Sequence, residues 1–173
     1  FIADTFGHCI RKVDKETGTI ETIAGKANSF GFSGDGGPAT EALLNYPEKV
    51  AVDSMGNIFI TDTKNRRVRK VNKETGIITT FAGNGSDGES GDGGAAVDAS
   101  FHFPCGLALD SAGNIYIGDM STLRKVDKET GVITTITGQA GSPGNLRDIG
   151  LASESFVDNV FGVFVDSLDN IFI

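Results

Sequence analysis

Aspartates recur at matching positions along this chain of 173 residues, and they are its first candidates for chemistry. Asp4, Asp62 and Asp119 each close a short run of mostly apolar residues. Carboxylates repeated in this way can lie on one face, where they could bind a cation or a basic partner. We favour the simpler interpretation that each one caps the loop beside it. Arg66 and Arg67 lie in and just after the polar connection that follows Asp62, and they join the three aspartates as candidate binding residues.

Two glycine-rich loops carry a second kind of acidic residue, Asp35 and Asp92, each followed by two glycines. A phosphate-binding loop needs a lysine and a helix start at this point, whereas Pro38-Ala39 and Ala95-Ala96 follow here. A calcium loop needs several carboxylates at alternating spacing, and each copy has one close aspartate. We therefore expect no cofactor, with calcium left unsupported. We expect Asp35 and Asp92 to accept hydrogen bonds from neighbouring N–H groups of their loops.

A third set of aspartates ends the first apolar run of each repeat, at Asp53, Asp110 and Asp166. Each is followed within four residues by an asparagine, with a glycine or a further aspartate before it. Hairpin geometry explains this pattern, because aspartate opens a turn and glycine or asparagine tolerates a positive φ. We expect a structural role for these three residues.

Other reactive side chains give little support for catalysis. His8 and His102 lie at non-equivalent places in the repeat and are interpreted as structural histidines. No nucleophile has an obvious base, so no catalytic residue is predicted and an enzyme is not expected. Cys9 and Cys105 are also non-equivalent, which favours two isolated, partly buried thiols over a disulfide.

Composition excludes several classes of partner. The net charge of −8 and the pI near 4.7 argue against nucleic-acid binding, which normally requires a basic excess. No apolar run approaches the roughly 18 residues that span a membrane, so no membrane insertion is expected. Basic residues gather at 64–70, and similar pairs occur at 11–12 and 124–125. We interpret them as the solvated face of one strand in each repeat.

The elements that position these residues are defined by an internal repeat of about 57 residues. The segment 56–62 returns at 113–119, begins again at 169–173, and has its tail at 1–4. Within one copy, short runs at 50–53, 58–62, 67–71 and 77–83 are rich in Val, Ile, Thr and Phe and are separated by turn residues. This pattern predicts four short antiparallel strands per repeat.

The predicted fold is an all-β propeller of four-stranded antiparallel blades. We assign the whole chain, 1–173, to one propeller segment of about three blade equivalents. The complete blades are 48–83 and 105–138, and the partial blades are 1–25 and 161–173. Because three blades do not close into a ring, we expect a piece of a longer chain that forms part of a six-bladed ring. Open blade edges could also support self-association.

The loops between the predicted blades carry a further pattern, at 33–47 and again at 90–104. Combined with the repeated strand-turn-strand segments at 50–62 and 107–119, it resembles the NHL repeat family in its long form. The resemblance covers nearly the whole chain, although the third loop, 141–152, lacks the Gly-Asp-Gly-Gly sequence. It implies a six-bladed propeller that binds a protein or a glycan, in an extracellular or cell-surface setting.

Three hypotheses for function follow from the residues and the resemblance. The first is a non-catalytic module that binds another protein, or a glycan, on a face of the disc or along the grooves between blades. The second is a metal-dependent propeller enzyme, similar to a lyase or a lactonase. The third is a structural protein that assembles through open blade edges.

Overall fold

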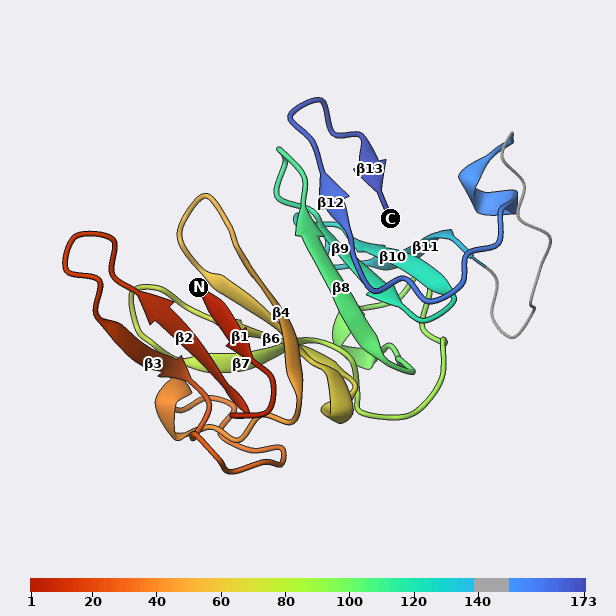
Figure 1. The fold of residues 1–173 in the computed structure, drawn as a ribbon. Coiled ribbons are helices and arrows are strands. Elements are labelled where there is room, and N and C mark those ends of the chain that lie inside the picture. Colours follow the sequence, from red (N-terminus) through yellow and green to blue (C-terminus); the bar gives the residue numbers. More distant parts are fainter. Residues whose placement is uncertain (139–149) are drawn as a thin grey trace.

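The computed structural model describes residues 1–138 and 150–173, and it contains strands and short 3₁₀ turns. Most of the third loop, 141–152, lies outside the described residues. The described strands form four antiparallel sheets in chain order (Figure 1). The first sheet comprises β1 (Ile2–Asp4), β2 (Cys9–Val13) and β3 (Ile20–Ala24). The last is a pair, β12 (Phe164–Val165) and β13 (Ile171–Phe172).

The two middle sheets each have four strands, and every strand pairs with the next one along the chain. The second sheet comprises β4 (Pro47–Val52), β5 (Ile58–Asp62), β6 (Arg67–Val71) and β7 (Ile78–Ala82). The third comprises β8 (Pro104–Leu109), β9 (Ile115–Asp119), β10 (Thr122–Val126) and β11 (Ile133–Thr137). Turns rich in glycine and asparagine join the strands, as a meander of short hairpins requires.

Apolar side chains meet between the sheets, where they form the core. One cluster joins the first two sheets, with Ile10 from β2, Leu44 from the intervening loop and Ile60 from β5. A second cluster joins the two middle sheets around Phe101, which is fully buried. A third packs β9 and β10 against the segment around Val160. Each sheet therefore covers the apolar face of its neighbour, as the blades of a propeller do.

One turn of 3₁₀ helix lies in each described connection between sheets. These turns are η1 (Ala39–Glu41), η3 (Ala96–Asp98) and η4 (Ala152–Glu154). Ala39 and Ala96 are buried, so the first two turns hold their loops against the neighbouring sheets. A fourth turn, η2 (Thr63–Asn65), lies between β5 and β6.

The predicted fold class is confirmed: the chain is all-β and consists of propeller-type antiparallel blades with up to four strands. The predicted complete blades, 48–83 and 105–138, correspond to sheets that run from Pro47 to Ala82 and from Pro104 to Thr137. Both cysteines are buried and free. Of the helices in the described residues, none has the length and apolar character needed to cross a bilayer.

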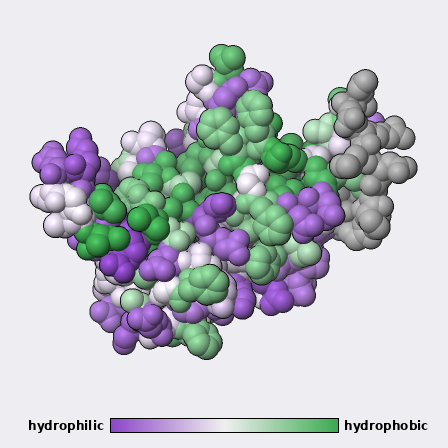
Figure 2. Space-filling model, in the orientation of Figure 1, coloured by the Kyte–Doolittle hydropathy of each residue, from purple (hydrophilic) through white to green (hydrophobic). Residues whose placement is uncertain are grey.

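Hydrophobic and hydrophilic side chains are unevenly distributed on the surface (Figure 2). Green side chains extend across the middle of the view, over the region where Figure 1 shows β4, β8 and β12. Along the lower side, green side chains lie among purple ones. The connections that follow β1 and β3 lie on this lower side.

Candidate binding face

One face of the molecule gathers most of the predicted binding residues. It carries the connections after the second strand of each blade, at 5–8, 63–66 and 120–121, and the loops between blades, at 25–46 and 83–103. We call it the loop face. Asp4, Asp62 and Asp119 are the last residues of β1, β5 and β9, so the repeat places all three beside this face.

Asp62 is buried, and the chain itself occupies its carboxylate. Oδ1 accepts hydrogen bonds from the Asn45 backbone N–H at 2.6 Å and from the Asn65 side chain at 2.8 Å. Oδ2 lies 3.2 Å from the Arg69 guanidinium. Burial raises the pKa of Asp62 to about 6, against the opposing effect of these hydrogen bonds and of the Arg69 charge. The residue ties the loop before β4 to the start of β6.

Asp119 repeats this role in the third sheet. It is buried, and it accepts hydrogen bonds from the backbone N–H groups of His102, at 2.9 Å, and of Phe103. Burial raises its pKa as well. Asp4 is more exposed, accepts from the Gly7 N–H at 3.2 Å, and lies 4.0 Å from Arg11. A direct role of the three aspartates in binding stays a prediction, and Asp4 is the member with exposed surface.

Arg69 and Arg124 correct one expectation from the sequence. The basic residues of the third strand were expected on a solvated face, yet both arginines are fully buried. The guanidinium of Arg69 donates to Asp35 at 2.6 Å, and that of Arg124 donates to Asp92 at 2.7 Å. Each arginine also donates to backbone carbonyls of the loop that covers it, and those hydrogen bonds and the aspartate offset the cost of burying the charge.

The same pairs revise the role expected for Asp35 and Asp92. Their carboxylates accept from an arginine on the neighbouring sheet rather than from N–H groups of their own loops. Each also reaches the fourth strand of that sheet, through the Thr80 hydroxyl at 2.6 Å and the Thr135 N–H at 2.7 Å. These aspartates therefore join one blade to the next.

The hairpin aspartates lie in tight turns away from the loop face. Asp53 accepts from the Asn57 N–H at 2.8 Å, and Asp110 accepts from the Asn114 N–H at 2.8 Å. Asp166 accepts from the Asn170 backbone N–H at 2.8 Å. Such contacts hold the asparagine against the turn, and they lower the pKa of all three carboxyl groups.

Arg66 and Arg67 lie on the loop face, at the start of β6. Arg66 has a left-handed backbone, with φ of 55°, and its guanidinium lies 3.4 Å from Asp87. Arg67 donates to the Asn84 carbonyl at 2.7 Å, and its guanidinium lies 3.9 Å from the centre of the Phe32 ring. Of the two, Arg67 therefore lies over an aromatic ring on the surface.

A group of aromatic side chains on this face was not predicted from the sequence. We call Phe6, His8, Phe30 and Tyr46 the aromatic cluster. The ring centres of Phe6 and Tyr46 are 5.6 Å apart, and His8 lies 5.1 Å from Tyr46 and 5.3 Å from Phe30. Phe6 is 81% exposed and Phe30 is 68% exposed. The members come from three separate segments, and only Tyr46 has an aromatic counterpart at the repeat spacing, Phe103, so the repeat does not mark them as a group.

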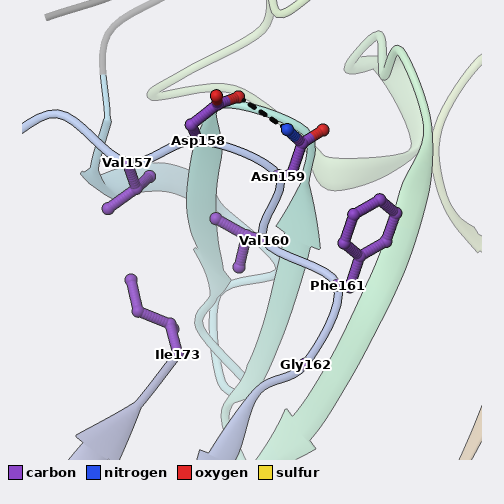
Figure 3. Close-up of a pocket in the computed structure, with 7 residues that line it drawn as sticks. All are labelled: Val157, Asp158, Asn159, Val160, Phe161, Gly162 and Ile173. Atoms are coloured by element: carbon purple, nitrogen blue, oxygen red, sulfur yellow. Dashed lines mark hydrogen bonds between the residues drawn. The ribbon is translucent and has the colours of Figure 1, made fainter.

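Two hollows lie near this face, and they differ in chemistry. The first, of about 300 Å³, is lined by Asn45, Thr63, Lys64, Arg66, His102 and Phe103. The second, of about 360 Å³, is lined by the segment 157–162 and Ile173 (Figure 3). In the second, Val157 and Val160 extend toward Ile173, while Asp158 and Asn159 bond to each other at its rim. No cluster of three or more metal-ligating side chains occurs among residues 1–138 and 150–173.

The architecture and its repeated loops define a propeller-type repeat protein, and comparison with known proteins gives the family. A profile of the Teneurin NHL domain matches residues 31–88 and 84–148. The chain therefore belongs to the NHL-repeat family. This membership supports a binding or interaction module as its general role.

Individual relatives extend the comparison. The chain is 31% identical over 138 residues to Protein SUPPRESSOR OF QUENCHING 1, chloroplastic, of Arabidopsis thaliana. The matched region covers 76% of this chain and 13% of that protein. It is 35% identical over 95 residues to Teneurin-3 of Mus musculus, which covers 48% of this chain and 4% of that protein. A structural genomics protein of unknown function from Bacteroides thetaiotaomicron shares the fold, with a TM-score of 0.70 and 20% identity over 91% of this chain and 37% of that chain.

Proposed function

We propose that this chain is a non-catalytic binding module that takes a protein partner on its loop face. The aromatic cluster carries the proposal. Phe6 and Phe30 are mostly exposed, so a partner that covers them removes apolar surface from water. Aromatic side chains and arginines are enriched at protein interfaces, where a few of them dominate the binding free energy.

Charged residues beside the aromatic cluster support the same face. Lys64 lies 3.7 Å from the centre of the Tyr46 ring, and Arg67 lies over Phe32. Asp4 adds an acidic group next to Phe6. An apolar centre with a charged rim is the usual composition of a protein interface. The family membership supports binding in general, and the surface chemistry supports a protein as the partner.

The test compares the wild-type chain with a Phe6→Ser, Phe30→Ser double variant. Each is immobilised and incubated with a protein extract of the organism from which the chain comes. The retained proteins are quantified by mass spectrometry. We expect a partner that the wild type retains to be depleted at least tenfold by the double variant. The matched control is Phe164→Ser, because Phe164 is exposed to a similar degree but lies in β12.

Two outcomes would overturn the proposal. Identical sets of retained proteins on wild type and double variant would exclude the aromatic cluster as the docking surface. Loss of the same proteins from the control would show that any exposed phenylalanine contributes equally. Circular dichroism of the variants separates loss of binding from loss of fold.

A further inference from the structure

The smaller polar hollow on the loop face is built from two successive blade boundaries. Asn45 comes from the loop before β4, and Thr63, Lys64 and Arg66 come from the connection between β5 and β6. His102 and Phe103 come from the loop before β8. Its volume is about 300 Å³, which is enough for one side chain of a partner. Thr63 is buried at its base, where its hydroxyl donates to the Pro104 carbonyl at 2.8 Å.

Two cationic side chains at this hollow, Lys64 and Arg66, have N–H groups that no carboxylate of the described residues occupies. The Lys64 ammonium contacts the Tyr46 ring, and no carboxylate of the described residues lies within 4.0 Å of it. The Nε atom of Arg66 is buried and has no hydrogen-bond partner. The Arg66 side chain is 37% exposed and pairs with Asp87 through one terminal nitrogen, so an incoming acceptor would meet the exposed part of the guanidinium.

Two acidic groups already lie near the hollow, on the side of Arg66 and His102 and not of Lys64. Asp87 lies 3.4 Å from one terminal nitrogen of Arg66 and 2.6 Å from Nδ1 of His102. The hydrogen bond with His102 lowers the pKa of Asp87, which is therefore ionised at neutral pH. Glu89 accepts from the Ser121 hydroxyl at 2.8 Å and lies 3.9 Å from His102. Neither acidic group contacts Lys64.

The corresponding positions in the other sheets do not reproduce the hollow. His8 and Met120 share the left-handed backbone of Arg66, with φ of 56° and 41°. Met120 has no charge, and the connection it belongs to is two residues shorter than 63–66. A left-handed backbone costs a non-glycine residue about 1 kcal/mol. The repeat therefore keeps the conformation at this position but changes the side chain.

We propose that this hollow binds the carboxylate of an aspartate or glutamate from an acidic peptide segment of the partner. The carboxylate accepts a hydrogen bond from Lys64 and pairs with the exposed part of the Arg66 guanidinium. Because Lys64 also contacts Tyr46, the hollow adjoins the aromatic cluster, and the peptide carries an apolar residue close to its acidic one. The inference rests on the proposed function, since it specifies the chemistry of that partner.

The experiment titrates the ¹⁵N-labelled full chain with an acetylated, amidated octapeptide of alternating glutamate and leucine, followed by NMR. We expect shifts of the backbone signals of Lys64, Arg66 and His102, and weaker binding at about 0.5 M salt. The matched peptide with glutamine in place of glutamate should bind at least fivefold more weakly. Lys64→Gln and Arg66→Asn should each lower the affinity for the acidic peptide about fivefold. Asparagine is chosen because it tolerates a positive φ.

Lys15→Gln is the control for net charge, because Lys15 lies in the exposed turn between β2 and β3. It should leave the affinity unchanged. Equal affinity of the two peptides, or an unchanged affinity in both hollow variants, would overturn the proposal. Preference for an oligosaccharide of glucuronate over the peptide would overturn it too, in favour of an acidic glycan. If the double phenylalanine variant still loses its partner while Lys64→Gln and Arg66→Asn retain it, the loop face stands and the carboxylate site fails.

Discussion

At the scale of single residues, the most informative contrast is between arginines at the same place in successive repeats. Arg69 and Arg124 are fully buried and paired with Asp35 and Asp92. Arg11 occupies the corresponding position in β2, but its Nε has no hydrogen-bond partner and its nearest carboxylate, Asp4, is 4.0 Å away. Arginines at equivalent strand positions therefore lie in two different environments. Arg11 can serve as the control for substitutions of the buried arginines.

Replacing these arginines should therefore have unequal effects. We expect Arg69→Met to lower the free energy of unfolding by about 3 kcal/mol, because Asp62 would remain buried without its cation. We expect Arg11→Met to cost less than about 1 kcal/mol, as is usual for exposed ion pairs. Urea denaturation of both variants measures the difference. Equal losses would contradict the role given to the buried pair.

Asp62 should make stability depend on pH. Its pKa of about 6 in the folded chain lies above the ordinary value of 3.8, so the folded state keeps this proton between about pH 4 and pH 6 while the unfolded state has lost it. The stabilisation is complete below about pH 4 and disappears as the pH rises through 6. We expect the stability of wild type relative to Asp62→Asn to fall by on the order of 2 kcal/mol over this range. Urea denaturation at several pH values measures it, and a flat difference would refute the expectation.

At the scale of elements, the loops between blades depend on backbone conformations open to glycine. Gly34 has φ of +88°, and a Cβ atom there would lie 2.7 Å from the Ala42 Cα. Gly36 has φ of +82°, but no atom would lie within 4 Å of a Cβ atom placed there. The first glycine therefore meets both a conformational and a steric limit, whereas the second meets only the conformational one.

Alanine substitutions separate these two limits. Gly36→Ala should cost about 1 kcal/mol, the price of a left-handed backbone. Gly34→Ala should cost at least about 2 kcal/mol, because the loop must also move away from η1. Thermal or urea unfolding of the two variants gives the comparison. A larger loss for Gly36→Ala would mean that the loop is not packed against η1 as described.

The strands themselves were predictable from the sequence, and the contacts between them were not. The second and third strands of the best-preserved repeat, 58–62 and 67–71, coincide with β5 and β6, since alternating apolar residues between turn residues define strands locally. The Arg69–Asp35 pair joins residues that are 34 positions apart. Local patterning carries no information about such a contact, so a buried arginine was interpreted as a solvated one.

At the scale of the whole molecule, the repeat predicted the fold class but only part of the candidate site. A repeat marks what successive blades share, such as Asp62 and Asp119 at the ends of β5 and β9. The aromatic cluster and the polar hollow depend on what the blades do not share. Tyr46 has an aromatic counterpart, Phe103, at the repeat spacing, but Phe6 and Phe30 have none. Their proximity arises only when the first two sheets pack together.

The unequal connections after the second strands have a final consequence. If His8, Arg66 and Met120 were identical, successive blades would present equivalent binding sites, related by rotation about the propeller axis. The three residues differ in side chain, and the segment that carries Met120 is shorter than the one that carries Arg66, so a molecule bound in one orientation would not meet the same contacts after rotation to the next blade. For the proposed partner, the differences between the blades would therefore fix its orientation on the propeller.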